Sequence, residues 1–102
     1  MSTDAKIYSL LGLAQRAGQL ISGDMSLENA LRKGQGELLL IAADCGANNR
    51  KKYEHLATRE KIEYILLGNR DELGEAIGKG HRAAVLVMNT GFAEAIRKLR
   101  NG

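Results

Sequence analysis

The chain has 102 residues, with 15 Lys or Arg, 12 Asp or Glu, and a formal net charge of +3. This length allows one domain with one continuous core. A content of 44% hydrophobic and 26% charged residues argues against disordered and fibrous classes. The mild excess of positive charge favours anionic partners without identifying one.

Cysteine content and hydropathy bear on the compartment. The single cysteine, Cys45, cannot form an internal disulfide, which suits a reducing cytosol. No apolar run approaches the roughly 20 residues that a membrane span needs, and the N-terminal segment does not resemble a secretory signal. We therefore expect a cytoplasmic protein that does not contact membranes.

The first third of the chain shows helical periodicity twice. A helix is predicted from Ser2, which can cap it, to Gly18, and a very short strand follows at Leu20–Ile21. A second helix is predicted between the Ser22-Gly23-Asp24 turn, which offers capping side chains, and Gly34. The residues of these helices expected to face the core are Ile7, Leu10, Leu11, Ala14, Leu27, Ala30 and Leu31.

The stretch from Leu38 to Lys52 organises the rest of the chain. Its first part, residues 38–43, is an apolar run bounded by glycines, which indicates a central strand covered on both faces. A turn then leads through two asparagines into the cations Arg50–Lys52, before a helical pattern resumes at residue 53.

The three cations of this stretch lie near the positive end of a helix macrodipole, which costs about 0.3–1 kcal/mol each when they are exposed. An anion held nearby reverses that sign, and a helix N-terminus with adjacent Arg and Lys is a natural phosphate site. Most charge runs are only solvated surface, so the pattern alone leaves both interpretations open.

Strands and helices alternate in the second half. Strands are predicted at Ile62–Leu67 and Ala83–Met88, a short helix from Asp71 to Gly78, and a last helix after Thr90. This alternation predicts an α/β fold, a three-layer α/β/α sandwich. The residues expected to face the core from the last two helices are Leu73, Ala76, Ile77, Phe92, Ile96 and Leu99.

No catalytic signature stands out. The sequence has no P-loop and no G-x-S-x-G, H-E-x-x-H or G-x-G-x-x-G motif. His55 and His81 have no second His or Cys at metal-ligand spacing, and a lone Cys45 at a strand end is more often a small core residue than a nucleophile. We expect no enzymatic activity, no cofactor and no metal.

Three polar loops that contain glycine favour a binding surface instead: residues 22–26, 44–51 and 79–82. If they meet at one edge of the sandwich, helix N–H groups, amides and cations lie together, as a surface for folded RNA requires. Lys79 and Arg82 can hold phosphates, and the flat ring of His81 can stack on an unpaired base, worth roughly 1–3 kcal/mol. Each loop alone is weak evidence.

From Gly23 to Phe92 the sequence resembles the L-seven-Ae and L-thirty-e superfamily of ribosomal proteins, which binds kink-turn RNA. The most specific segments are LLLIAADC from Leu38, ELGEAIGK from Glu72 and AAVLVMNTGFA from Ala83. The earlier segment LLGLAQRAGQLISG resembles the short bacterial YlxQ-type members. The resemblance implies an α/β/α sandwich with a mixed four-stranded sheet and RNA at one edge.

In that superfamily the start of the second helix recognises the sheared G·A pairs of the kink, and the loop before the last strand covers a flipped-out nucleotide. His81 stands where an aromatic or apolar residue often contacts the extruded base. The RNA-binding residues that the resemblance implies are Gly23, Asp24, Met25, Ser26, Asn29, Asp44, Arg50, Lys51, Lys79, Gly80, His81 and Arg82.

The sequence departs from the family pattern at the start of the second helix. Many members have Gly-x-Asn-Glu and then Lys one turn later, whereas this chain has Met25, Ser26 and Asn29 at those positions. A base-reading amide, a carboxylate and a cation are therefore absent, and Asp24 adds negative charge where phosphates approach.

These observations predict that residues 1–102 form a single, non-enzymatic RNA-binding domain of ribosomal-protein type that acts as a monomer. The expected partner is a structured RNA, such as a kink-turn in ribosomal or messenger RNA. The main alternative is a protein-interaction module whose basic helix docks an acidic translation or transcription factor. A third interpretation is a small enzyme or regulator that holds phosphate at Arg50–Lys52.

Overall fold

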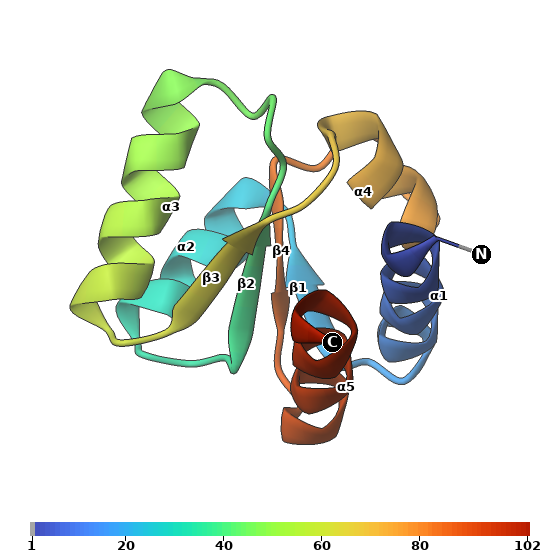
Figure 1. The fold of residues 1–102 in the computed structure, drawn as a ribbon. Coiled ribbons are helices and arrows are strands. Elements are labelled where there is room, and N and C mark those ends of the chain that lie inside the picture. The colour runs from blue at the N-terminus through green and yellow to red at the C-terminus, as the bar shows by residue number, and fades with distance from the viewer. Residues whose placement is uncertain (1) are drawn as a thin grey trace.

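The computed structural model describes residues 2–102, which form five helices and four strands (Figure 1). Each helix and strand expected from the sequence is present. The predicted ends are within three residues of the observed ones, except that the third helix begins at Ala47, six residues before the point where a helical pattern was expected to resume. None of the helices in this range is both long and apolar enough to cross a membrane. In chain order the elements are α1 (Thr3–Arg16), β1 (Leu20–Ser22), α2 (Asp24–Arg32), β2 (Leu38–Ile41), α3 (Ala47–Arg59), β3 (Glu63–Leu66), α4 (Arg70–Ala76), β4 (Ala84–Val87) and α5 (Thr90–Asn101).

The four strands form one mixed sheet in the order β1-β4-β2-β3. β4 runs antiparallel to both β1 and β2, whereas β2 and β3 are parallel. In this register Leu40 of β2 lies opposite Val85 of β4 on one side and Ile65 of β3 on the other. It follows that β1, β2 and β3 all run in one direction and end at the same edge of the sheet, where β4 begins.

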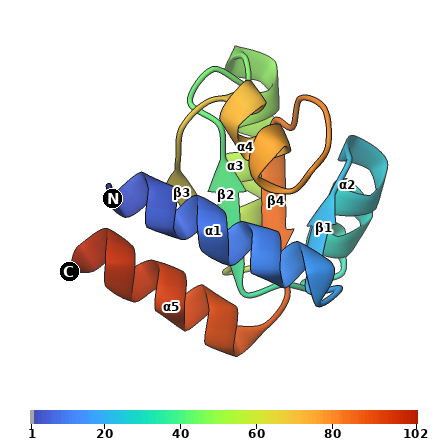
Figure 2. The same ribbon diagram turned by 90° about the vertical axis from the view of Figure 1, so that its right-hand side faces the viewer.

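Helices cover both faces of the sheet. α2 and α3 lie on one face, and α1, α4 and α5 lie on the other (Figure 1). On the second face, α1 and α5 run side by side across the sheet (Figure 2). The predicted three-layer α/β/α sandwich with a mixed four-stranded sheet is therefore confirmed.

The core follows the apolar runs of the sequence. Every residue of β2 and β4 is buried, because these two strands are central and have helices on both faces. The predicted central position of the strand in residues 38–43 is confirmed. β3 is an edge strand, so its first residue, Glu63, is exposed and the others are half-buried. Burying a large aliphatic side chain contributes roughly 1.5–3 kcal/mol, so the central strands contribute strongly to the stability of the fold, together with the apolar helix faces packed on them.

Several helix caps differ from the sequence-based expectation. α2 begins after Gly23 with no side-chain cap, although Ser22 and Asp24 were expected to supply one. Both have other partners: Ser22 belongs to β1 and its Oγ accepts from Arg82, while the Asp24 carboxylate accepts from Tyr53. The expectation of a side-chain cap was therefore wrong.

The caps of the last two helices lie upstream of the expected starts, by two residues for α4 and by one for α5. Asn69 caps α4, and its side chain accepts from the backbone N–H of Glu72 at 2.8 Å. The Glu72 carboxylate accepts in turn from the backbone N–H of Asn69 at 3.1 Å, so the helix begins at Arg70. Asn89 caps α5 in the same way, accepting from the backbone N–H of Phe92 at 3.0 Å.

Candidate nucleic-acid interface

One edge of the sheet collects the loops that the sequence singled out. Because β1, β2 and β3 end there, α2, α3 and α4 all begin there, and the α4–β4 loop returns to the same edge. We call this edge the rim and define it as residues 22–26, 44–51, 68–72 and 79–83. Open α/β sheets bind ligands outside the carboxyl ends of their strands, so the topology makes the rim the first place to look for function.

A cavity of about 370 Å³ lies within the rim. It brings together the expected loops at 22–26, 44–51 and 79–82, and it adds the start of α4. Its lining residues are Gly23, Asp24, Asn49, Arg70, His81, Arg82, Ala83 and Ala84.

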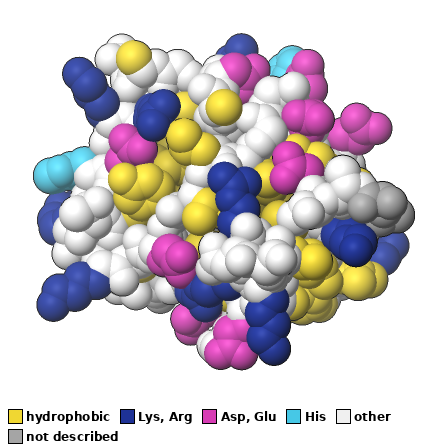
Figure 3. Space-filling view, viewed as in Figure 1, with side chains coloured by type: hydrophobic (Ala, Val, Ile, Leu, Met, Phe, Trp, Pro, Cys, Tyr) yellow, Lys and Arg dark blue, Asp and Glu magenta, His cyan; other side chains and the backbone are white. Residues whose placement is uncertain are grey.

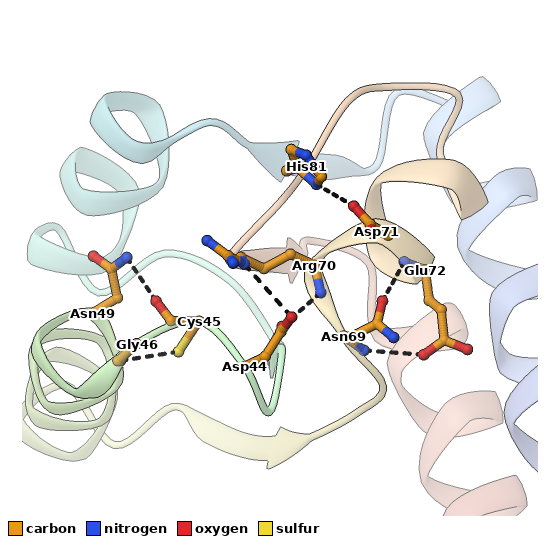
Figure 4. Close-up of polar contacts among 9 residues, drawn as sticks. All are labelled: Asp44, Cys45, Gly46, Asn49, Asn69, Arg70, Asp71, Glu72 and His81. Atoms are coloured by element: carbon orange, nitrogen blue, oxygen red, sulfur yellow. Dashed lines mark hydrogen bonds and ion pairs between the residues drawn. The ribbon is translucent and has the colours of Figure 1, made fainter.

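Four lining residues were not among the predicted site residues: Asn49 and Arg70, which are polar, and Ala83 and Ala84. Arg70 could have been predicted from the sequence, because it is a cation at the start of a helix that follows a parallel strand. Arg50 and Lys51 lie in the same way near the start of α3. The short side chain of Asn49 carried no such signal. Its Nδ2 donates to the backbone carbonyl of Cys45 at 3.0 Å, which closes the β2–α3 turn (Figure 4).

The N-termini of α2 and α3 have no side-chain cap, unlike those of α1, α4 and α5. Their N-cap residues are Gly23 and Gly46, at φ +88° and +95°, values that other residues rarely adopt. The first N–H groups of both helices are therefore not occupied by a side-chain cap and open on the rim. They carry the positive end of each helix dipole, which favours an anion there.

The carboxylates of the rim are bonded within the protein. Asp24 accepts from the hydroxyl of Tyr53 at 2.7 Å, and Asp44 accepts from the backbone N–H of Arg70 at 2.8 Å. Asp71 pairs with His81, and Glu72 belongs to the capping box of α4 (Figure 4). Each carboxylate is thus held in place by a donor of the fold.

Tyr53 remains a hydrogen-bond donor over the whole range of ordinary pH. Its side chain is fully buried, and this burial, followed by the bond to Asp24, raises the pKa of its hydroxyl well above the usual range. The interaction joins α3 to the first turn of α2, so it fixes the position of the α2 N-terminus at the rim.

Two rim cations, Lys51 and Lys79, are exposed and have no ion-pair partner within residues 2–102. Arg50 instead pairs with Glu54 of its own helix at 3.2 Å. Lys52 turns toward α2 and pairs with Glu28 at 2.8 Å. Within the run at 50–52, Arg50 and Lys52 are thus turned toward separate carboxylates, whereas Lys51 has no ion-pair partner in the described residues. The third interpretation, in which this run holds phosphate, stays a hypothesis.

Arg82 fastens the α4–β4 loop to the sheet. Its Nε donates to Ser22 Oγ at 3.1 Å, and its Nη1 donates to the backbone carbonyl of His81 at 2.9 Å. Its backbone N–H donates to the carbonyl of Arg70 at 3.1 Å. Arg82 is therefore a structural link between β1, the loop and α4, in addition to any role with an anion.

Gly74 of α4 determines how closely this loop approaches the helix. A Cβ at Gly74 would overlap the backbone carbonyl oxygen of Gly80, and the N–H of Lys79 donates to the carbonyl of Gly74 at 2.8 Å. The loop thus lies directly on α4 because residue 74 has no side chain. No local sequence pattern indicates this contact.

Two side chains suited to contacting bases are exposed at the rim. His81 is 74% exposed while one edge of its ring pairs with Asp71. Met25, in the first turn of α2, is 78% exposed and is the more exposed of the two large hydrophobic residues that lie open to solvent in the described chain, the other being Leu13. A flat ring and a thioether can both pack on the face of a base.

Cys45 is not a candidate nucleophile. Its side chain is 3% exposed, and burial raises the pKa of its thiol. Within residues 2–102, no three His, Cys, Asp or Glu side chains come together as a metal site would require.

The structure distributes the twelve predicted site residues over the rim and the adjoining helix surface. Gly23, Asp24, His81 and Arg82 line the cavity, and Asp44 contacts it through Arg70. The others lie around it: Met25, Ser26 and Asn29 are exposed on α2, Arg50 and Lys51 on α3, and Lys79 and Gly80 in the loop before β4. That these residues bind RNA stays a prediction.

A small α/β/α sandwich with uncapped helix N-termini and a basic loop at one edge defines a class of anion-binding or nucleic-acid-binding domain. Comparison with family models is more specific. The model described as the Ribosomal protein L7Ae/L30e/S12e/Gadd45 family matches residues 5–99, and the chain belongs to this family.

Individual relatives agree with this assignment. The chain is 34% identical over 92 residues to the RNA-binding protein YlxQ of Bacillus subtilis, which covers 90% of this chain and 92% of the relative. It is 29% identical over 97 residues to the large ribosomal subunit protein eL30 of Tetrahymena thermophila, covering 93% of each. These relatives are named as RNA-binding or ribosomal proteins and not as enzymes.

Solved structures show the same fold. A protein of unknown function from Bacillus halodurans superposes with a TM-score of 0.89 at 37% identity, covering 96% of this chain and 99% of that one. The 15.5kD RNA binding protein of Giardia lamblia superposes with a TM-score of 0.75 at 15% identity, covering 97% and 85%. The second likeness establishes the fold alone.

Proposed function

We propose that this chain is a non-enzymatic RNA-binding protein of ribosomal-protein type that holds a structured RNA at the rim. The observation that carries the proposal is the meeting, at one edge, of two uncapped helix N-termini with the loop 79–82. The names of the relatives support the same class of partner. In this proposal residues 1–102 act as one RNA-binding domain, as a monomer in the cytoplasm.

Phosphates are recognised by the positive groups that the fold leaves unpaired. The N–H groups at the start of α2 and α3 point to the rim, and Lys51 and Lys79 add mobile charges beside them. The rim carboxylates oppose phosphates less than free carboxylates would, because each is bonded to a protein donor.

An unpaired base is recognised by the exposed side chains and the cavity. His81 and Met25 offer flat or apolar surfaces, and the cavity lined by His81 and Asn49 offers polar groups around an open space. A kink-turn is the first RNA to test, since it places an extruded base beside G·A pairs. Because Met25, Ser26 and Asn29 replace the usual base-reading residues, we expect the G·A pairs to contribute less than in typical family members.

The experiment is an electrophoretic titration of the protein against a kink-turn RNA, the same RNA without its G·A pairs, and a plain duplex. We expect the first to bind most tightly, the second somewhat less, and the duplex least. Equal affinity for all three RNAs at every salt concentration would contradict recognition of a structured RNA and leave only nonspecific attraction.

The rim is tested with the double variant Lys51→Ala/Lys79→Ala. Each lost phosphate contact should reduce the slope of log affinity against log salt by about 0.7–0.9. The matched control is Lys98→Ala/Arg100→Ala, which removes two exposed cations from α5 in the other helical layer. An unchanged slope in the rim variant would exclude these lysines as phosphate contacts.

Base stacking is tested with His81→Ala. The substitution should weaken binding of the RNA with an extruded base, by an amount corresponding to roughly 1–3 kcal/mol if the stack is well formed. It should change the affinity for plain duplex little. An equal loss on both RNAs would remove the stacking role.

A further inference from the structure

The largest local excess of positive charge lies in one helix and the turn after it. Residues 47–61, which are α3 and that turn, contain five Lys or Arg and two Glu, a net charge of +3. The whole chain also has a net charge of +3, so the remaining residues balance to zero. In contrast, α4 contains one Arg and three carboxylates.

These two helices begin at the same rim but lie on opposite faces of the sheet (Figure 1). In the space-filling view, Lys, Arg and His side chains line the left side of the molecule over α3, whereas Asp and Glu gather at the upper right over α4 (Figure 3). A polyanion bound at the rim therefore meets attraction on one flank and repulsion on the other.

The outer face of α3 carries a continuous row of donors, which we call the α3 stripe: Lys51, His55 and Arg59. They are four residues apart, so they lie on one face of the helix, and all three are exposed. With a rise of 1.5 Å per residue, the stripe extends about 12 Å from the rim.

The carboxylate of α3 itself, Glu54, does not pair with any residue of the α3 stripe. Glu54 is bonded to Arg50 at 3.2 Å, and Lys52 turns toward Glu28 of α2 at 2.8 Å. The carboxylate that meets the stripe is Glu60, which pairs with Arg59 at its far end at 3.0 Å. An exposed pair of this kind contributes little to stability and separates readily when a stronger anion arrives.

Helix stability does not explain the charges at the rim end of the stripe. The first turn of α3 has no acidic residue, and Arg50 in that turn and Lys51 directly after it both oppose the macrodipole. Only Arg59, in the last turn, is favoured by the dipole. A phosphate backbone lying along the helix would stabilise the whole row, because it brings negative charge to the N-terminal cations as well.

We propose that one duplex arm of the bound RNA leaves the rim along the α3 stripe, and that the acidic α4 flank directs the other arm away from the protein. This inference rests on the proposed function, since it assigns a direction to the RNA that the rim holds. The ligand chemistry is that of successive backbone phosphates, met by an ammonium, an imidazole and a guanidinium group.

Directed cleavage tests the path of the arm. The variants His55→Cys on α3 and Glu75→Cys on α4 are each labelled with an iron chelate that generates hydroxyl radicals, and native Cys45 is left unlabelled because it is 3% exposed. The probe is the kink-turn RNA with both arms lengthened by about one helical turn. We expect strand cleavage within one arm from position 55 and none from position 75. Equal cleavage from both positions, or cleavage from position 75 alone, would overturn the proposal.

Charge reversal tests the energetics. The variant His55→Glu/Arg59→Glu leaves the rim residues intact, and the control Lys98→Glu/Arg100→Glu makes a larger change in net charge on α5. We expect the stripe variant to bind the long-armed RNA about tenfold more weakly, and the control to lose much less. A short-armed RNA should lose less than about twofold, because it ends near the rim.

The outcomes separate this inference from the proposed function. If the wild-type protein binds none of the structured RNAs, both fail. If the Lys51→Ala/Lys79→Ala variant weakens binding but charge reversal on the stripe changes neither RNA, only the path along α3 fails. If the stripe variant loses binding to an acidic protein while its affinity for long-armed RNA is unchanged, the stripe belongs to a protein interface and the proposal is wrong.

Discussion

Two carboxylates at the rim, Asp24 and Asp44, stabilise the fold at a place where a ligand could also bind. Asp44 ends the turn after β2, where its Oδ1 accepts from the backbone N–H of Arg70, and its side chain is still 51% exposed. Asp24 is fixed in a similar way by Tyr53. These bonds fix the position of both carboxylates at the rim.

Replacing Asp44 should separate its structural role from its charge. Asp44→Ala removes the acceptor for the Arg70 N–H, and we expect it to lower the free energy of unfolding by about 0.5–1 kcal/mol, the lower part of the range for a helix cap, because water can partly replace an exposed acceptor. Asp44→Asn retains an acceptor and should cost less. Urea denaturation measures both, and equal losses in the two variants would contradict the assigned hydrogen bond.

The same pair of variants reports on RNA. Asp44→Asn removes a negative charge from the rim while keeping the start of α4 in place, so its affinity for RNA should equal or exceed that of the wild type. A marked loss of affinity in Asp44→Asn, with unchanged stability, would show that the carboxylate itself contacts the ligand.

At the scale of elements, the functional edge depends on how α4 and the loop after it fit together. Gly74 allows the loop backbone at Gly80 to lie against the helix, and Arg82 then ties the end of the loop to Ser22. The position of His81 follows from these two contacts. The loop is thus held by a fixed helix on one side and by β1 on the other.

Gly74→Ala tests this fit. Alanine is favoured over glycine in a helix by about 1 kcal/mol, but here the added Cβ overlaps a backbone carbonyl, and such overpacking typically costs 1–3 kcal/mol. We expect a net loss of stability of about 1 kcal/mol, together with a displaced loop and weaker RNA binding.

Glu75→Ala is the control for this prediction, since Glu75 is the exposed neighbour on the same helix. Its effect on stability should stay within about 0.5 kcal/mol. Thermal unfolding measures stability, and the NMR signals of His81 report the loop. A Gly74→Ala protein that is more stable than the wild type, with unchanged His81 signals, would contradict the close contact.

At the scale of the whole molecule, two tyrosines with buried hydroxyl groups link stability to alkaline pH. Tyr8 of α1 and Tyr53 of α3 lie in opposite helical layers. Burial, followed by the charges of Glu72 and Asp4, raises the pKa of Tyr8 to about 12. Burial and the bond to Asp24 raise the pKa of Tyr53 further.

Both tyrosines stay protonated in the folded state while unfolded tyrosine ionises near pH 10. Below pH 10 neither state loses the protons, so stability does not depend on them. As pH rises above 10, the unfolded state releases protons first, and the free energy of unfolding should fall by up to about 1.4 kcal/mol per pH unit for each fully buried hydroxyl.

Urea denaturation between pH 8 and 11, compared in wild type and Tyr53→Phe, checks this prediction. The variant loses the bond to Asp24, so it should be less stable at pH 8 by about 1 kcal/mol, and its decline above pH 10 should be shallower. The two curves should therefore approach each other at high pH. Parallel curves would exclude Tyr53 as a source of the alkaline destabilisation.

Charge distribution is also a property of the whole molecule. A net charge of +3 describes a mildly basic protein, but the excess lies in residues 47–61 while α4 is acidic. Steering of an anionic partner depends on this asymmetry more than on the total. It is the physical basis for assigning a direction to the bound RNA.

The sequence by itself determined the local features of this protein. Apolar periodicity predicted the helices and strands, because the side chains of an element must match its period. The unbroken apolar run at 38–43 identified a central strand, and the family resemblance implied a mixed sheet of four strands. The positions of the three loops were also predicted, because glycines and polar residues separate the helices and strands there.

Only the tertiary structure decided which of these features share a surface. Sheet order and strand direction place the starts of α2, α3 and α4 at one edge, and neither is encoded in any single segment. From the local sequence, Asp24 was assigned to a helix cap and both Asp24 and Asp44 to ligand binding. In the structure they accept hydrogen bonds from Tyr53 and Arg70, which lie 29 and 26 residues away in the chain. Long-range hydrogen bonds and close contacts such as Gly74 against Gly80 arise from packing, which is why local sequence patterns did not reveal them.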